Sequence, residues 1–453
     1  MLVPILMEIG RRFGVRVTLG EFFDAPTIEK IASRIRELSR DRAPQKRFGR
    51  RLARTGPEVD AFFDMLRADA VLDPALRLPA GSITEAGDVS NLFITGVTGF
   101  VGAYVFNELL QRTRQRFTCL VRATDADEGR ERLLKAMKRH DLWDDSFADR
   151  FSVVGGELSR PRFGLDARTY ARLTDECDAA MHLAAHVNFI YPYRALKAAN
   201  VDGTHEVVRF CFTGRAKPLH HVSTAAIWPM GSTFRPFRED DDINHGVRLN
   251  IGYDDSKWAA EQVVLEARER GLPVTIYRPG EVAGHSVTGR CALDHFMWAI
   301  VKGSIQMEAF SEMKSPLDIA PIDYIAAAIA VLSADPRATG GTYHLNNPRP
   351  GDPDDIHAIL REYGYSFAIQ PFDEWVEKLL TSEQLLENAL YPFAAILEEF
   401  EDENMQLPTC DTTHAQTALA GTGVVCPPVG ASLMRKYLDY LVDVGYLNPP
   451  ARS

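Results

Sequence analysis

The stretch LFITGVTGFVG, residues 92–102, is the most informative part of this chain about its fold. Its apolar start predicts a buried strand, and a helix is expected to begin at about Phe100, after glycines at 96 and 99 and before a third at 102. Where side chains are absent, the backbone can turn sharply and approach a pyrophosphate, which the free N–H groups of the following helix attract. The stretch therefore predicts a dinucleotide-binding turn.

Further strand-like runs follow between helical stretches, which indicates one fold class for the main part of the chain. These runs are FTCLVRA (117–123), RFSVVGG (150–156), AAMHLAA (179–185), KPLHHVST (217–224) and VTIYRPG (274–280). Alternation of strands and helices is typical of a parallel sheet covered on both faces. We therefore predict an α/β protein with a Rossmann-type, doubly wound parallel sheet. Beyond Gly284 the pattern becomes mostly helical, which predicts a C-terminal substrate subdomain.

Composition excludes several classes of protein. The chain has 453 residues, of which 45% are hydrophobic and 25% charged, and its net charge of -11 disfavours a nucleic-acid partner. The six cysteines occur singly with no C-x-x-C pair, which predicts neither a metal site nor a disulfide framework. The first residues lack the order of a signal peptide, and no run is long enough for a membrane span. We expect a cytoplasmic monomer that contacts no membrane.

The end of the second strand predicts which nicotinamide cofactor is used. Enzymes that prefer NAD carry an acidic residue there, about 20 residues after the glycines, to bind the ribose 2′-hydroxyl. This chain has Arg122 at that place, and Arg132 follows on the next helix. Two guanidinium groups can hold a 2′-phosphate through charge-assisted hydrogen bonds, so we expect NADPH.

A tyrosine and a lysine lie four residues apart in YDDSK, residues 253–257. On a helix this spacing sets the Tyr253 phenol and the Lys257 ammonium on one face, and the upstream run HHVSTAA closes a strand with Ser223 and Thr224. A carbonyl that accepts hydride needs a proton donor, and a nearby ammonium lowers the pKa of a tyrosine, ordinarily about 10. We expect Tyr253 to donate the proton, Lys257 to lower its pKa and Thr224 to orient the carbonyl oxygen.

From about residue 88 to 345 the chain resembles the thioester reductase domains that end nonribosomal peptide and polyketide synthases, and the reductase half of carboxylic acid reductases. Both belong to the extended short-chain dehydrogenase/reductases. The matching motifs, in order, are TGVTGFVG (95–102), CLVRA (119–123), GGELSRPRFGL (155–165), HLAAHVNFIYPY (182–193), ANVDGT (199–204), HVSTA (221–225), YDDSKWAAE (253–261) and RPGEVAGHSVTG (278–289).

The resemblance implies a set of cofactor contacts in addition to catalysis by Thr224, Tyr253 and Lys257. Glu157 departs from the family pattern, which has aspartate near the adenine, although the longer glutamate can reach the same donor. The full set implied for the cofactor is Thr95, Gly96, Thr98, Gly99, Phe100, Val101, Gly102, Arg122, Arg132, Glu157, Leu158, Ala184, Ala185, His186, Thr224, Tyr253, Lys257, Pro279 and Gly280.

The N-terminal segment resembles the second half of an acyl or peptidyl carrier domain. The motif residues are Arg12, Phe13, Gly14 and Val15, then Phe22, Phe23, Pro26, Thr27 and Ile28. In that family the phosphopantetheine serine opens the first of these helices, so here it would precede Met1. We divide the chain into a carrier fragment (1–42), a basic linker (43–56), a helical extension (57–87), an NADPH-binding domain (88–285, returning at 316–346) and a substrate subdomain (286–315 and 347–453).

The reaction that the resemblance implies is NADPH-dependent release of an acyl or peptidyl chain from the thioester of a carrier protein. The product is an aldehyde, which a second hydride would convert to an alcohol. Three alternatives stay open: a fatty acyl-CoA or aldehyde reductase, an NAD-dependent nucleotide-sugar epimerase or dehydratase, and a non-catalytic NADP-binding scaffold or sensor.

Overall fold

The computed structural model describes residues 2–15, 17, 22, 27–40, 56–79, 81, 83–231, 235–247, 249, 251–312, 315–382, 384–397 and 407–450. Phe23 and Pro26 of the carrier motif lie outside the described residues, as does all of the expected linker except Gly56. In the described part of the chain, no helix is both long and apolar enough to cross a membrane.

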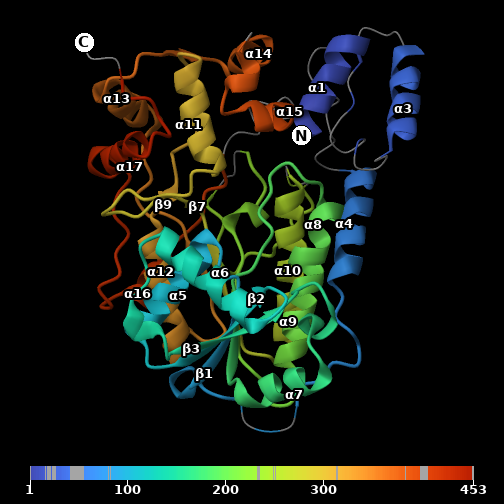
Figure 1. The fold of residues 1–453 in the computed structure, drawn as a ribbon, viewed down its shortest axis with the longest axis vertical. Coiled ribbons are helices and arrows are strands. Elements are labelled where there is room, and N and C mark those ends of the chain that lie inside the picture. The colour runs from blue at the N-terminus through green and yellow to red at the C-terminus, as the bar shows by residue number, and fades with distance from the viewer. Residues whose placement is uncertain are drawn as a thin grey trace.

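A seven-stranded parallel sheet has the strand order β10-β6-β5-β4-β1-β2-β3. Its strands β1, β2 and β3 are labelled in the lower half of Figure 1. The strand order reverses between β1 and β4, which is the point where open α/β sheets bind ligands. The predicted Rossmann fold is therefore confirmed. The strands are β1 (Asn91–Thr95), β2 (Arg116–Arg122), β3 (Phe151–Gly156), β4 (Ala179–His182), β5 (Leu219–Val222), β6 (Val274–Pro279) and β10 (Thr342–Leu345).

Helices cover both faces of the sheet because successive residues of each strand point to opposite sides. Leu92 and Ile94 of β1 pack with the helices of one face, and Phe93 packs with those of the other. The first face carries α5 (Phe100–Arg112), α6 (Ala126–Arg139) and α12 (Ile322–Ala334). The second carries α4 (Pro57–Ala70), α7 (Ala167–Glu176), α9 (Gly203–Cys211) and α10 (Gly252–Glu269).

The C-terminal subdomain is mostly helical and has two apolar clusters of its own, centred on Trp298 with Tyr437 and on Trp375 with Leu390. Its elements are α11 (Phe296–Gln306), β8 (Ala309–Ser311), α13 (Pro353–Tyr363), β11 (Ala368–Gln370), α14 (Phe372–Thr381), α15 (Ala394–Leu397) and α17 (Ala431–Asp443). The short strands β7 (Glu281–Val282) and β9 (Ile319–Ala320) pair where the subdomain leaves the sheet.

One helix of the segment assigned to the substrate subdomain packs elsewhere. Helix α16 (Thr413–Leu419) places Ala415 and Leu419 in the core that β1 and α12 share. The assignment of all of 347–453 to the substrate subdomain was therefore wrong for this helix, because its apolar side chains are buried against the cofactor domain.

The N-terminal segment forms the two expected helices, α1 (Leu2–Phe13) and α3 (Ile28–Arg40). Leu6 and Ile9 of α1 form a small apolar cluster, and Ile190 of the main domain packs against it. Helix α1 also lies beside α15 and the short helix η8 (Tyr391–Phe393) (Figure 1). The segment therefore rests against both the sheet domain and the helical subdomain.

Candidate active site

The glycine turn brings the end of β1 into direct contact with the chain that leaves β4. Gly96 has φ of +82°, and a Cβ atom there would lie 2.4 Å from the backbone nitrogen of Ala184. A Cβ atom on Gly102 would lie 2.0 Å from the carbonyl oxygen of Gly96. Only glycine fits at these two positions, and the turn exposes the start of α5 at the carboxyl edge of the sheet, as a dinucleotide phosphate requires.

The two predicted arginines lie together at the end of β2. The exposed Arg122 is the last residue of the strand, in register with Gly156 of β3. Arg132 donates a hydrogen bond from Nη1 to the carbonyl oxygen of Arg122 and lies 3.9 Å from Glu128. The Arg122 guanidinium has no hydrogen bond or ion pair with the other described residues. It is therefore better placed than Arg132 to bind an anion.

The three predicted catalytic residues lie on two neighbouring parts of the chain, Thr224 just after β5 and Tyr253 and Lys257 in the first turns of α10. Thr224 precedes a short 3-10 turn, and its Oγ1 accepts a hydrogen bond from the backbone N–H of Ala226 at 3.1 Å. Tyr253 lies in the first turn of α10, with its ring 5.8 Å from that of Phe189 in an edge-on contact. The buried Lys257 follows one turn later and donates from Nζ to the carbonyl oxygen of Val222 at 2.9 Å.

The pKa of Tyr253 is shifted in the direction opposite to the one predicted, and the pKa of Lys257 is shifted as well. Burial raises the pKa of the Tyr253 phenol above its ordinary value, and the carboxylates of Asp254 and Glu281 raise it further. Burial also lowers the pKa of Lys257 to about 8. The predicted lowering of the tyrosine pKa by Lys257 was therefore wrong for this structure, because burial and the charges of Asp254 and Glu281 raise that pKa, while the Lys257 ammonium is bonded to Val222.

Asn200, which the sequence did not single out, ties the loop after β4 to α10. Its Oδ1 accepts from the backbone N–H of His186 at 2.7 Å, and its Nδ2 donates to Ser256 Oγ at 2.8 Å. Ser256 in turn donates to the carbonyl oxygen of Tyr253 at 2.7 Å. The motif ANVDGT contains this residue, but only the fold brings it to the helix of Tyr253.

His182 is a second buried polar residue that was missed. It lies between two hydroxyl groups, with Nδ1 2.8 Å from Thr95 Oγ1 and Nε2 3.1 Å from Thr204 Oγ1. Burial lowers its pKa to about 3, so the ring is neutral at physiological pH. This bonding fixes the end of β4, from which Ala184 and Ala185 pass beside the glycine turn.

The remaining predicted cofactor residues occupy the same edge of the sheet. Glu157 follows β3, and the side chain of Leu158 packs against Gly203, where a Cβ atom would lie 2.8 Å from Leu158 Cγ. Pro279 ends β6, and Gly280 packs so closely on Asn346 that a Cβ atom would lie 2.5 Å from its Nδ2. These residues lie near the site, but Leu158 serves the packing of the core.

Two acidic residues that no sequence signal marked, Glu281 and Asp318, influence the charges of this region. Glu281 follows Gly280 directly and lies 3.3 Å from His295 Nδ1. Burial raises the pKa of Asp318 to about 6, and the neighbouring Glu281 contributes to the rise. Within the described ranges, no group of three or more His, Cys, Asp or Glu side chains is arranged to hold a metal ion.

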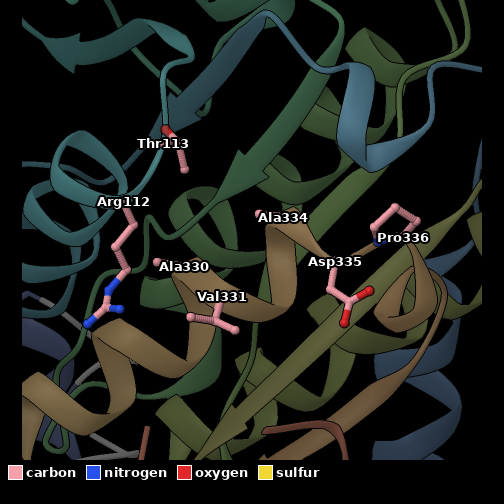
Figure 2. A pocket seen from close by; sticks show the side chains of 7 residues that line it. All are labelled: Arg112, Thr113, Ala330, Val331, Ala334, Asp335 and Pro336. Atoms are coloured by element: carbon pink, nitrogen blue, oxygen red, sulfur yellow. The ribbon is translucent and has the colours of Figure 1, made fainter. Parts of the chain in front are cut away.

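An open hollow of about 520 Å³ lies away from these residues, lined by Arg112, Thr113, Ala330, Val331, Ala334, Asp335 and Pro336 (Figure 2). Helix α5 begins at the glycine turn and runs for 13 residues, from Phe100 to Arg112. That length corresponds to about 20 Å. The hollow is therefore at the amino edge of the sheet and contains none of the predicted site residues.

The glycine turn at the strand reversal and the Tyr–Lys pair on α10 define an oxidoreductase of the short-chain type that uses a nicotinamide cofactor. Residues 94–329 match the family described as "Male sterility protein". The terminal R domain from the myxalamid PKS-NRPS pathway is 38% identical, with a TM-score of 0.82 over 86% of this chain and 100% of that domain. The chain belongs to this family, as a terminal reductase domain of the kind found in these synthases.

Two further similarities extend to the N-terminal segment. A linear gramicidin synthase protein of Brevibacillus parabrevis is 32% identical over 448 residues, which are 98% of this chain but 9% of that protein. The next curated relatives are likewise covered over only 44% and 27% of their length. A thiolation-reductase di-domain from an archaeal nonribosomal peptide synthetase shares the fold over 98% of this chain and 90% of its own, with 21% identity and a TM-score of 0.71.

Proposed function

We propose that this chain catalyses NADPH-dependent reductive release of an acyl or peptidyl group held as a thioester on a carrier protein. One observation carries the proposal: Lys257, one turn after Tyr253 on α10, is bonded to the carbonyl oxygen of Val222, two residues before Thr224, at the edge of the sheet where the glycine turn also lies. The membership in the terminal reductase domains supports a thioester as the substrate.

When it is bound, the nicotinamide cofactor would supply hydride to the thioester carbonyl carbon. The residues that fit it are the glycine turn for the pyrophosphate and Arg122 for the 2′-phosphate, since a guanidinium matches a phosphate and no carboxylate ends β2. We therefore propose NADPH rather than NADH. Lys257 lies one helical turn from Tyr253, where its remaining donors can hold the nicotinamide ribose.

Tyr253 donates a proton as negative charge grows on the carbonyl oxygen. An alkoxide is far more basic than a phenolate, so this transfer is downhill even from a phenol whose pKa is raised. The raised pKa also keeps the phenol protonated before reaction. Thr224, whose Oγ1 already accepts from Ala226, can use its own O–H to orient the substrate oxygen.

The carbon–sulfur bond then breaks. The hemithioacetal hydroxyl gives up its proton as the carbon–sulfur bond breaks, the pantetheine sulfur takes up a proton and leaves as a thiol, and the acyl carbon leaves as an aldehyde. A second hydride delivered at the same residues would give an alcohol. Phe189 is partly buried and its ring contacts that of Tyr253, and we propose that the acyl group packs against it.

The partner we propose is a phosphopantetheinyl carrier. Ile190, against which the carrier-like helices pack, directly follows Phe189, whose ring contacts that of Tyr253. A carrier-type fold therefore rests one residue away from the wall of the catalytic site. No such arrangement is needed by an enzyme whose substrate is a free nucleotide sugar.

A substrate panel tests the proposal. The protein is incubated with NADPH and with an acyl-pantetheine thioester, the matching acyl-CoA or a UDP-sugar, and oxidation of NADPH is followed by absorbance. We expect the acyl-pantetheine, and more strongly the same acyl group on a carrier protein, to be reduced fastest. Preference for acyl-CoA would favour a fatty acyl-CoA reductase, and conversion of only the UDP-sugar would favour an epimerase or dehydratase.

A further inference from the structure

A buried ion pair between Glu261 of α10 and Arg278 of β6 lies next to the catalytic residues and takes no part in the transfer of hydride or proton. Glu261 Oε1 accepts from Arg278 Nη2 at 2.6 Å and from Nε at 3.0 Å. The two side chains are 0% and 2% exposed. Glu261 lies on α10, four residues after Lys257, so it faces the same side of the helix as the catalytic pair.

The pair is bonded to the residue that precedes Thr224. Ser223 donates from Oγ to Glu261 Oε2, and its backbone N–H donates to the carbonyl oxygen of Tyr277 at 2.7 Å. Ser223 is therefore held on both its side chain and its backbone. Because Thr224 is the next residue, its backbone direction is fixed at the amino-terminal side.

The same arginine also fixes the chain after Thr224. Trp228 ends the short turn that Thr224 begins, and its indole Nε1 donates to His344 Nε2 at 3.2 Å. Arg278 Nη1 lies 3.2 Å from the same nitrogen, and its guanidinium lies 5.2 Å from the Trp228 ring centre. Both ends of the turn therefore depend on the Glu261–Arg278 pair.

His344 can accept hydrogen bonds at Nε2 only as the neutral tautomer that carries its proton on Nδ1. Burial and the nearby Arg278 lower its pKa to about 3, so the ring is neutral. Nδ1 lies 3.0 Å from the carbonyl oxygen of Asp411, which can only accept, so the proton is on Nδ1 and Nε2 is the acceptor for Trp228 and Arg278.

We propose that Ser223, Glu261 and Arg278 are positioning residues that set the Thr224 hydroxyl for the reduction. This inference rests on the proposed function, because it assigns Thr224 to the substrate oxygen. A buried ion pair adds little to stability compared with apolar residues of the same volume. We infer that the ion pair instead fixes the geometry of the chain before Thr224, through Ser223, and after it, through Trp228.

Ser223→Ala tests the inference with little risk to the fold, because it removes one hydroxyl and leaves the ion pair intact. The matched control is Ser333→Ala, which removes a buried hydroxyl that donates to Ala330 on α12, outside the site. We expect the Ser223 variant to lose about tenfold in kcat, with the Kd of NADPH and the unfolding midpoint equal to those of the control. Ser223→Thr should restore most of the lost turnover.

An activity-independent readout separates this inference from the proposed function. The Ala226 N–H is bonded to Thr224 Oγ1, so we expect faster hydrogen exchange in residues 225–228 of the Ser223→Ala protein than in the control. A wild-type protein that reduces no thioester would contradict the proposed function alone. Unchanged exchange together with unchanged kcat in Ser223→Ala would overturn the positioning role.

A double variant covers the ion pair itself. Removing one charge would leave the other buried and uncompensated, so Glu261→Leu and Arg278→Met are combined to keep the volume. We expect a folded protein that binds NADPH but turns over at least about tenfold more slowly. Full turnover in a folded double variant would contradict the inference.

Discussion

The ammonium nitrogen of Lys257 lies 2.9 Å from the carbonyl oxygen of Val222, two residues before Thr224. This hydrogen bond joins Lys257 of α10 to the end of β5, which leads into Thr224. It therefore fixes the position of the helix relative to the strand end. Lys257 is nevertheless buried, and burial lowers its pKa from 10.5 to about 8. Its charge is therefore sensitive to moderately alkaline pH.

We predict that the affinity for NADPH falls as pH rises through about 8. A lowered lysine pKa means that the cation is present below that value and lost above it, and a neutral amine is a weaker donor to the ribose. Fluorescence titration between pH 7 and 9.5 measures the effect, which we expect to be about tenfold. Lys257→Met should abolish the dependence, whereas Lys378→Met, an exposed lysine on α14, should keep it. The same fall in NADPH affinity at alkaline pH in Lys257→Met would show that the pH dependence does not come from Lys257.

Tyr253→Phe should keep the Kd of NADPH within about twofold and reduce kcat by two to four orders of magnitude, because the ring stays while the proton donor is lost. Tyr365→Phe is the control, since its hydroxyl donates to Asn448 far along the chain. Both variants are compared in the same NADPH oxidation assay. Near-normal turnover of Tyr253→Phe would show that another group supplies the proton.

Arg122→Ala should weaken binding of NADPH at least about tenfold and leave NADH nearly unaffected, because only NADPH carries the 2′-phosphate. Arg116→Ala serves as the control, since this exposed arginine begins the same strand that Arg122 ends. Dissociation constants for both cofactors give the comparison. Equal losses for the two cofactors would mean that Arg122 does not meet the 2′-phosphate.

Gly102→Ala should destabilise the protein by about 2 kcal/mol or more, because the added Cβ atom would lie 2.0 Å from the Gly96 carbonyl oxygen. Gly87→Ala is the control, since the nearest atom to a Cβ atom there is 3.8 Å away. Chemical denaturation with and without NADPH measures the free energy of unfolding. A Gly102 variant as stable as the Gly87 variant would contradict the close approach of α5 to the turn.

The sequence was sufficient for the features that depend on local spacing. Three glycines after an apolar strand predicted the turn at Gly96, and a tyrosine and a lysine one turn apart predicted that both lie on one face of a helix. Contacts between distant segments could not be read in this way. Asn200 bonds to Ser256 across 56 residues, and Glu261 meets Arg278 only because α10 packs on β6.

The protonation of the site was also beyond the sequence. The direction of the Tyr253 pKa depends on burial and on Asp254 and Glu281, of which Glu281 comes from a separate strand. The spacing of Tyr253 and Lys257 alone suggested the opposite direction. Helix α16 was assigned to the wrong core for the same reason, since its partners on α12 and β10 are distant in sequence.

The most direct test of reductive release is to follow deuterium from the cofactor into the product. The protein is given an acyl-pantetheine thioester and NADPH deuterated at both C4 positions, and the products are trapped and their masses measured by mass spectrometry. We predict an aldehyde with one deuterium on the former carbonyl carbon, or an alcohol with two, at a rate that Tyr253→Phe nearly abolishes. Release of the free acid without deuterium would contradict the account.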